Sequence, residues 1–158
     1  MKGLNSIGLD IEKSKETVDK LENILANYSI FYQNVRGYHW NVSGELFFDL
    51  HIKFEELYTD LVEKIDDIAE RIRELGGFPN HNYSYYLTVS EIKESEQIKD
   101  GVKCVEGVLE GLSVLIINQR KLVKFTDKND DDGTSDLMTN NIKEQEKLAW
   151  MYAAFLNK

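Results

Sequence analysis

The sequence predicts an all-α protein, a bundle of four long helices in which one long crossover carries a short helix. Apolar residues recur at steps of three and four along most of the 158 residues, which is the spacing of a buried helix face. Residues that break helices fall mainly at 37–44, at 76–79 and around Gly133. Because 42% of the residues are apolar, the chain can bury a real core, and we expect a single domain over residues 1–158.

The first two long helices are expected on either side of the break at 37–44. A connection this short indicates that the two helices run antiparallel. Their apolar positions are Val18, Leu21, Leu25, Tyr28, Tyr32 and Val35 in the first helix, and Leu50, Phe54, Leu57, Leu61, Ile65, Ile68, Ile72 and Leu75 in the second.

Residues 78–95 form the long connection to the third helix. The segment is rich in aromatic residues, and Thr88 with Glu91 matches the capping-box pattern that begins a helix. A connection of this length can cross the bundle from end to end and carry a short helix, as in bundles with one long crossover.

The last two long helices flank the break at Gly133. The third helix contains Gly101, Gly107 and Gly111, which indicate either close approach of a neighbouring helix or local slack. The fourth begins after Gly133, where Thr134 or Ser135 can cap it and Asp136 complements the helix dipole. The apolar positions are Ile98, Val102, Val105, Leu109, Leu112, Ile116 and Val123, then Met138, Ile142, Ala149, Tyr152 and Leu156.

Charge and cysteine content narrow the class of protein. The chain has 28 acidic and 19 basic residues, a formal charge of −9, whereas gripping the phosphates of DNA or RNA requires clustered Lys and Arg. The lone Cys104 lies in an apolar-periodic stretch and is expected to fill the core. Neither a signal peptide nor a run of about 18 apolar residues is evident, so we expect a cytoplasmic protein with no membrane partner.

On a helical wheel, possible metal ligands lie beside the apolar face of the second helix. His51 with Glu55, and Asp66 with Glu70, have the i,i+4 spacing that directs two side chains to one spot. The other charged residues of this helix fall on the remaining face, which we expect to be solvated: Lys53, Glu56, Asp60, Glu63, Lys64, Asp67, Arg71 and Glu74.

The distance along the helix predicts a site shared by two subunits. His51 and Asp66 are 15 residues apart, a rise of about 22 Å, whereas a metal–ligand bond is about 2 Å long. If two copies of this helix pack antiparallel about a two-fold axis, the His51 end of one lies opposite the Asp66 end of the other. Such a dimer would contain the site twice.

His39 adds a second imidazole, because the short break at 41–46 folds the end of the first helix back toward His51. Two imidazoles and three carboxylates suit iron, manganese or zinc better than calcium or magnesium. The alternatives are a solvated face for the carboxylates and a buried, hydrogen-bonded role for His39 beside Trp40. A di-iron centre within one subunit is disfavoured because no histidine has a glutamate three positions before it, and His81 is expected at the surface or in packing.

The residues around these ligands closely resemble the Dps family of mini-ferritins. The resemblance extends over nearly the whole chain. It lies in Gly37-Tyr-His-Trp-Asn-Val-Ser-Gly44, in Phe47, His51, Phe54 and Tyr58, in Asp66, Ala69-Glu-Arg-Ile72 and Gly76, and in Asp130-Asp-Asp-Gly-Thr-Ser-Asp136 and Trp150.

The resemblance implies a ferritin-like fold, a hollow dodecamer and ferroxidase activity. A ferroxidase of this family oxidises Fe(II), typically with hydrogen peroxide, and stores Fe(III) mineral inside the shell, which protects against oxidative stress. His39 and His51 of one subunit would face Asp66 and Glu70 of its two-fold partner, with up to two iron ions per site. The family usually has Asp at the position of Glu55, whose extra methylene keeps the charge and shifts the carboxylate.

The resemblance also implies roles beyond the ligands. Trp40 is similar to a family tryptophan that absorbs stray oxidising equivalents, and plain packing beside the site is the alternative. The four acidic residues of one segment, Asp130, Asp131, Asp132 and Asp136, resemble those that line three-fold iron pores. Without the resemblance, the same run is typical of a solvated loop followed by a helix N-terminus.

Two functions therefore stay open. The leading one is an iron-oxidising storage cage, and the alternative is a structural or DNA-protective assembly on the same fold with weak or absent ferroxidase activity. Some family members bind DNA through a lysine-rich tail, but residues 1–10 contain one lysine and the chain ends at Lys158 just after the fourth helix. We expect no appreciable DNA binding at physiological salt.

Overall fold

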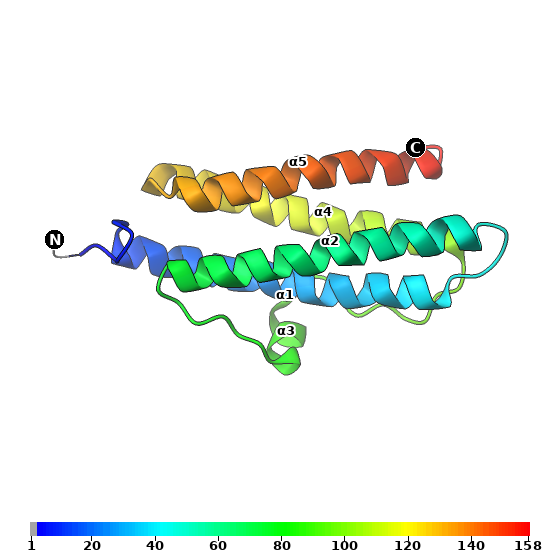
Figure 1. Ribbon diagram of the computed structural model, residues 1–158, viewed down its shortest axis with the longest axis horizontal. Helices are drawn as coiled ribbons and strands as arrows, with labels where there is room; N and C mark the ends of the chain where they lie inside the picture. Colours follow the sequence, from blue (N-terminus) through cyan, green and yellow to red (C-terminus); the bar gives the residue numbers. More distant parts are fainter. Residues whose placement is uncertain (1–2) are drawn as a thin grey trace.

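Five α-helices account for most of the structure, a computed structural model that describes residues 3–158 (Figure 1). No helix within that range is long and apolar enough to cross a membrane. The helices are α1 (Ile11–Asn41), α2 (Phe47–Glu74), α3 (Tyr83–Val89), α4 (Gly101–Thr126) and α5 (Asp132–Phe155), and a short 3-10 turn, η1 (Asp127–Asn129), joins the last two.

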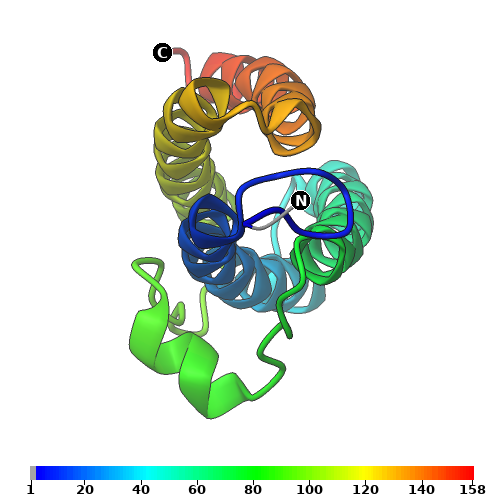
Figure 2. The same ribbon diagram turned by 90° about the vertical axis from the view of Figure 1, so that its left-hand side faces the viewer.

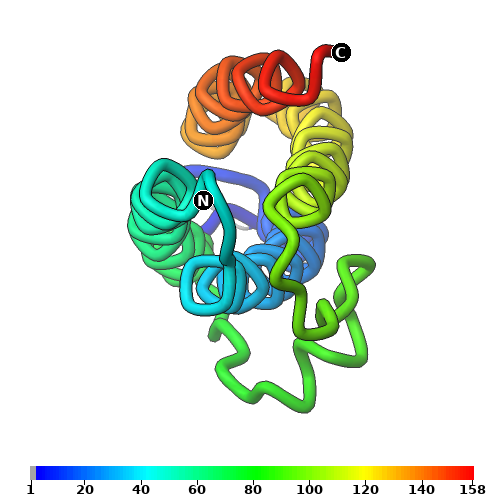
Figure 3. Tube along the Cα trace, turned by 90° about the vertical axis from the view of Figure 1, so that its right-hand side faces the viewer, coloured from blue at the N-terminus to red at the C-terminus, as the bar shows by residue number. Residues whose placement is uncertain are grey.

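The four long helices form the predicted antiparallel bundle. Figures 2 and 3 show it from its two ends, with α1 beside α2 and α4 beside α5. The crossover between α2 and α4 runs along the outside of α1 and carries α3 there (Figure 1). Asn27, fully buried in α1, holds the crossover in place, because its Oδ1 accepts hydrogen bonds from the backbone N–H groups of Glu91 and Ile92 (both 3.0 Å).

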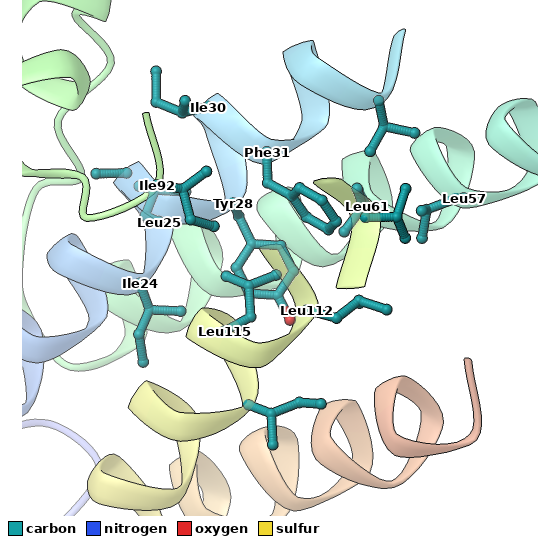
Figure 4. Close-up of a cluster of buried hydrophobic side chains, with 14 of the residues drawn as sticks. Ile24, Leu25, Tyr28, Ile30, Phe31, Leu57, Leu61, Ile92, Leu112 and Leu115 are labelled. Atoms are coloured by element: carbon teal, nitrogen blue, oxygen red, sulfur yellow. The ribbon is translucent and has the colours of Figure 1, made fainter. Parts of the chain in front are cut away.

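The core follows the predicted helical spacing. Every apolar position expected in α2 is buried, except that Ile65 is half-buried. At mid-bundle, Tyr28 and Phe31 of α1 pack against Leu61 of α2 and against α4 (Figure 4). Each large side chain removed from water contributes about 1.5–3 kcal/mol, so this packing is the main force that holds the helices together.

Two of the α4 glycines mark close approach of α1. A Cβ on Gly107 would meet the Tyr38 hydroxyl, and a Cβ on Gly111 would meet the Phe31 ring. Of the two readings of these glycines, the structure therefore supports close packing. Cys104 on the same helix is fully buried as predicted, and burial, with a smaller effect of Asp100, raises the pKa of its thiol to about 11.

Two predicted helix starts were wrong. The cap of α5 is Asp131, whose Oδ1 accepts from the Thr134 N–H (3.0 Å), because an aspartate three residues earlier reaches the free N–H groups of the first turn. The Thr88 capping box does not begin a helix. Thr88 lies in the last turn of α3, where its hydroxyl donates to the Ser84 carbonyl (2.9 Å).

The helical wheel also assigned Lys64 to the wrong face of α2. This residue was assigned to the solvated face of α2, but its side chain is only 8% exposed, because Asp60 and Glu144 of α5 enclose its ammonium group. Arg71 is likewise half-buried, against the start of α5. Lys64 and Arg71 on the part of α2 that faces α5 therefore form ion pairs with α5 and with its capping residue.

The close approach at Gly111 can be tested with Gly111→Ala. Alanine favours a helix over glycine by about 1 kcal/mol, but the added methyl displaces the buried Phe31 ring, which costs about 1–3 kcal/mol. We expect thermal denaturation to show a lower melting temperature. Gly37→Ala in α1 is the matched control, because a Cβ there meets nothing within 4 Å, and it should leave the melting temperature unchanged or raised. Equal effects of both changes would contradict the close packing.

Candidate metal centre

The two predicted imidazoles meet where α1 ends and α2 begins. His39 lies in the last turn of α1 and His51 in the second turn of α2, and the turn between them contains Gly44 at φ +103°, a conformation that favours glycine. The two rings stack with centroids 3.8 Å apart and planes 14° from parallel. α1 continues through Gly37 to Asn41, and the turn at 42–46 brings His39 to His51 as expected.

A reciprocal pair of hydrogen bonds fixes both rings. His39 Nδ1 lies 2.6 Å from the His51 carbonyl oxygen, and His51 Nδ1 lies 2.8 Å from the His39 carbonyl oxygen. A carbonyl oxygen only accepts, so each Nδ1 must carry a proton and donate it. In the neutral imidazoles the lone pairs are therefore on Nε2, the tautomer that a metal-ligating histidine needs.

Aromatic side chains hold this pair from two sides. The Phe47 ring stacks on His51 at 4.9 Å between centroids, and the Tyr58 ring meets His39 edge-on at 5.3 Å. The sequence assigned these two residues no role, although they lie four residues before and seven after His51, on the same helix face. Trp40 is 56% exposed, and the Arg36 guanidinium lies over its ring at 4.7 Å.

The carboxylates predicted as ligands point away from the core of their own subunit. Glu55, Asp66 and Glu70 are all exposed along α2. Within residues 3–158 of one subunit, no three His, Cys, Asp or Glu side chains come together in a way that could hold a metal ion. A single chain thus presents a pair of imidazoles at one end of α2 and a pair of carboxylates toward the other.

The acidic segment before α5 divides into two groups. Asp130, Asp132 and Asp136 are exposed, whereas Asp131 is 3% exposed and its Oδ1 lies 2.7 Å from Arg71 Nη2. Contrary to the expectation, Asp131 is not available to line a pore, because it already caps α5 and pairs with Arg71 within the subunit. His81 is exposed, in agreement with the surface position expected for it.

Comparisons with known proteins agree with this architecture. A ferritin-like domain model matches residues 18–158. A protein of Haemophilus influenzae is 51% identical over 149 residues, which are 94% of this chain and 93% of that protein. The DNA protection during starvation protein of Porphyromonas gingivalis is 37% identical over 155 residues, 98% of each chain.

A solved structure extends the similarity to three dimensions. The crystal structure of the Dps protein from Vibrio cholerae O1, described as a member of a broad superfamily of ferritin-like diiron-carboxylate proteins, superimposes with a TM-score of 0.97 at 47% identity and covers 99% of this chain and 98% of its own. The chain belongs to the Dps family. The predicted family and the predicted ferritin-like fold of this Dps chain are thus confirmed.

The Arg71–Asp131 pair of this Dps chain predicts a large effect of Arg71→Ala. The change leaves a buried carboxylate without its cation and removes the donor to Thr134 Oγ1, which together cost about 3 kcal/mol. Thermal melting should therefore show clear destabilisation. Arg120→Ala is the control, because its ion pair with Glu146 is half-exposed and such pairs contribute less than about 1 kcal/mol. If both variants melt alike, Asp131 does not depend on Arg71.

Proposed function

We propose that the protein is a ferroxidase that oxidises Fe(II) at sites between subunits and stores the Fe(III) product inside a hollow dodecamer, in the cytoplasm. The observation that carries the proposal is the reciprocal bonding of His39 and His51, which leaves the lone pair of each stacked ring on Nε2 at one end of α2. A buried, hydrogen-bonded role for His39 alone would not require a second ring in the same tautomer beside it.

The carboxylates complete this site from a second subunit. Two α2 helices packed antiparallel about a two-fold axis place Asp66 and Glu70 of one chain opposite His39 and His51 of the other. Membership of the Dps family supports this arrangement and the twelve-subunit shell. Glu55, one helical turn from His51, is the fifth proposed ligand and is exposed on the same flank of α2.

The donor set suits the oxidation of iron. Imidazole nitrogens bind Fe(II), and carboxylates stabilise the higher charge of Fe(III), so the site favours loss of an electron from bound iron. Two Fe(II) ions supply the two electrons that reduce one hydrogen peroxide, with two protons, to two waters. Because both electrons come from one site, a hydroxyl radical need not be released.

Further residues have proposed roles around this reaction. Exposed Trp40, next to a ligand, would absorb oxidising equivalents that escape the site. Asp130, Asp132 and Asp136, which are exposed before and within the first turns of α5, would attract Fe(II) to an entry pore. The negative charge of the whole chain would act in the same direction.

A second candidate function is a DNA-protective or structural assembly with little ferroxidase activity. The name of the Porphyromonas gingivalis relative, a DNA protection during starvation protein, favours it. The charge of −9 opposes direct contact with DNA, so protection by iron removal is the form that fits this chain.

Exchange of subunits tests the shared site directly. His51→Ala and Asp66→Ala should each abolish rapid oxidation of Fe(II) by peroxide, because each removes one half of every site. Subunits of the two variants, unfolded and reassembled together at equal amounts, should regain about a quarter of the wild-type rate, since half of random dimers contain one intact site out of two. The rate is followed by the absorbance of Fe(III).

Two outcomes would contradict the proposal. Wild-type rates in both single variants would remove the enzymatic function and favour the structural alternative. Inactive variants that gain nothing on mixing would place the site within one subunit. Asp67→Ala, a neighbouring exposed carboxylate outside the proposed ligand set, is the control and should keep the wild-type rate.

DNA binding is tested by gel shift at physiological salt. With low-micromolar protein and linear duplex DNA we expect no stable complex, because the net charge of each subunit is −9. A retarded complex that weakens as salt rises would show that phosphate contacts exist and would restore direct DNA binding as a function.

A further inference from the structure

A buried ammonium group joins α2 to α5 in the middle of the bundle. The side chain of Lys64 is 8% exposed, and its Nζ lies 2.6 Å from Asp60 Oδ1 and 2.6 Å from Glu144 Oε2. Burial lowers the pKa of Lys64, but hydrogen bonds and charge from the two carboxylates outweigh burial, so its pKa lies above the ordinary value. The group is therefore a fixed cation held by one carboxylate from each helix.

The other three long helices contribute a second group of polar side chains, which is buried. The Tyr28 hydroxyl of α1 donates to Gln119 Oε1 of α4 (2.8 Å) and accepts from Gln145 Nε2 of α5 (2.6 Å), and Gln119 Nε2 donates to Gln145 Oε1 (2.7 Å). The three side chains are almost fully buried. Burial raises the pKa of Tyr28, and the charges of Asp60 and Glu144 act in the same direction.

The Tyr28, Gln119 and Gln145 side chains thus form a polar layer inside the bundle, whereas the carboxylates that hold Lys64 lie nearer the surface, with Asp60 35% and Glu144 60% exposed. Four-helix bundles that hold metal within one subunit build the site in such a layer, from inward carboxylates and histidines. Here the layer contains two amides and a phenol and no histidine, and the two carboxylates lie toward solvent. The two carboxylates also line a groove of about 770 Å³ between α2 and α5, from which water can reach them.

We infer that Lys64 fills a cation-binding site between Asp60 and Glu144, with its ammonium in the position of a divalent ion, and so keeps metal out of the groove between α2 and α5. One carboxylate oxygen from each helix lies at hydrogen-bonding distance from Nζ, and two carboxylates with water are the ligands that Mn²⁺ and Mg²⁺ prefer. Lys64 is therefore a specificity-determining residue, which confines metal binding to the histidine-containing interface.

The test removes the ammonium in a background without the interface site. In the His51→Ala, Asp66→Ala double variant, adding Lys64→Gln should raise the binding of Mn²⁺ by about one ion per subunit, counted by electron paramagnetic resonance of the free ion. Adding Glu144→Gln to that variant should abolish the gain, because it removes the carboxylate from α5. The proposed ferroxidase site is absent from every chain compared, so the result does not depend on whether the proposed ferroxidase function is correct.

Lys53→Gln in the same background is the matched control. Lys53 pairs with Glu56 at 2.8 Å, but both side chains are more than half-exposed and both lie on α2, so no carboxylate of a second helix faces the vacated position. This variant should bind no additional Mn²⁺. A gain equal to that of Lys64→Gln would overturn the inference, because any freed surface carboxylate would then suffice.

The melting temperature gives a second measurement. Removal of Lys64 leaves two carboxylates facing each other, so Lys64→Gln should melt lower than its parent, and Mn²⁺ should raise its melting temperature while leaving the parent unchanged. If Lys64→Gln folds only when Mn²⁺ is present, that also supports the inference. A folded variant that neither binds Mn²⁺ nor is stabilised by it would overturn the inference. An unfolded variant that stays unfolded when Mn²⁺ is added would overturn it as well.

Discussion

The proposed chemistry depends on the rise of a single helix. α2 keeps His51 and Asp66 about 22 Å apart, so no rotamer change can bring them to one ion. The structure agrees, since no metal-binding group of three or more side chains forms within the described part of one subunit. The reciprocal bonds of His39 and His51 then give each end of α2 a different chemistry, because the imidazoles are oriented at one end and the free carboxylates lie toward the other.

A related division separates carboxylates that are paired within the subunit from carboxylates that are exposed and unpaired in the described residues. The carboxylate of Asp131, buried in its subunit, has the guanidinium of Arg71, and those of Asp60 and Glu144 have the ammonium of Lys64. The carboxylates of the proposed iron site have no ion pair within 4 Å in the described residues, and are exposed. An acidic chain can in this way be stable as a subunit and still offer oxygen ligands to metal ions at chosen places.

Periodicity predicted the fold well because burial follows the helical repeat. All eight α2 positions expected in the core are buried or half-buried. The burial of Lys64 was not predicted because a helical wheel sorts residues by hydrophobicity alone. A buried lysine can be predicted only when the position of its partner carboxylate on another helix is known. The α5 cap was not predicted for a related reason. Several adjacent residues are able to cap a helix, and only the backbone conformation shows that Asp131 does so.

The proximity of His39 and His51 was predicted from the sequence, but the atoms through which they meet were not. Sequence spacing brings His39 near His51, but it does not distinguish which ring nitrogen faces a carbonyl, and that choice decides whether the pair can ligate. If each subunit then carries only half of a site, iron binds the paired state alone and stabilises it in proportion to the logarithm of iron concentration. Oxidation would therefore be confined to assembled protein, where the Fe(III) product has a cavity to enter.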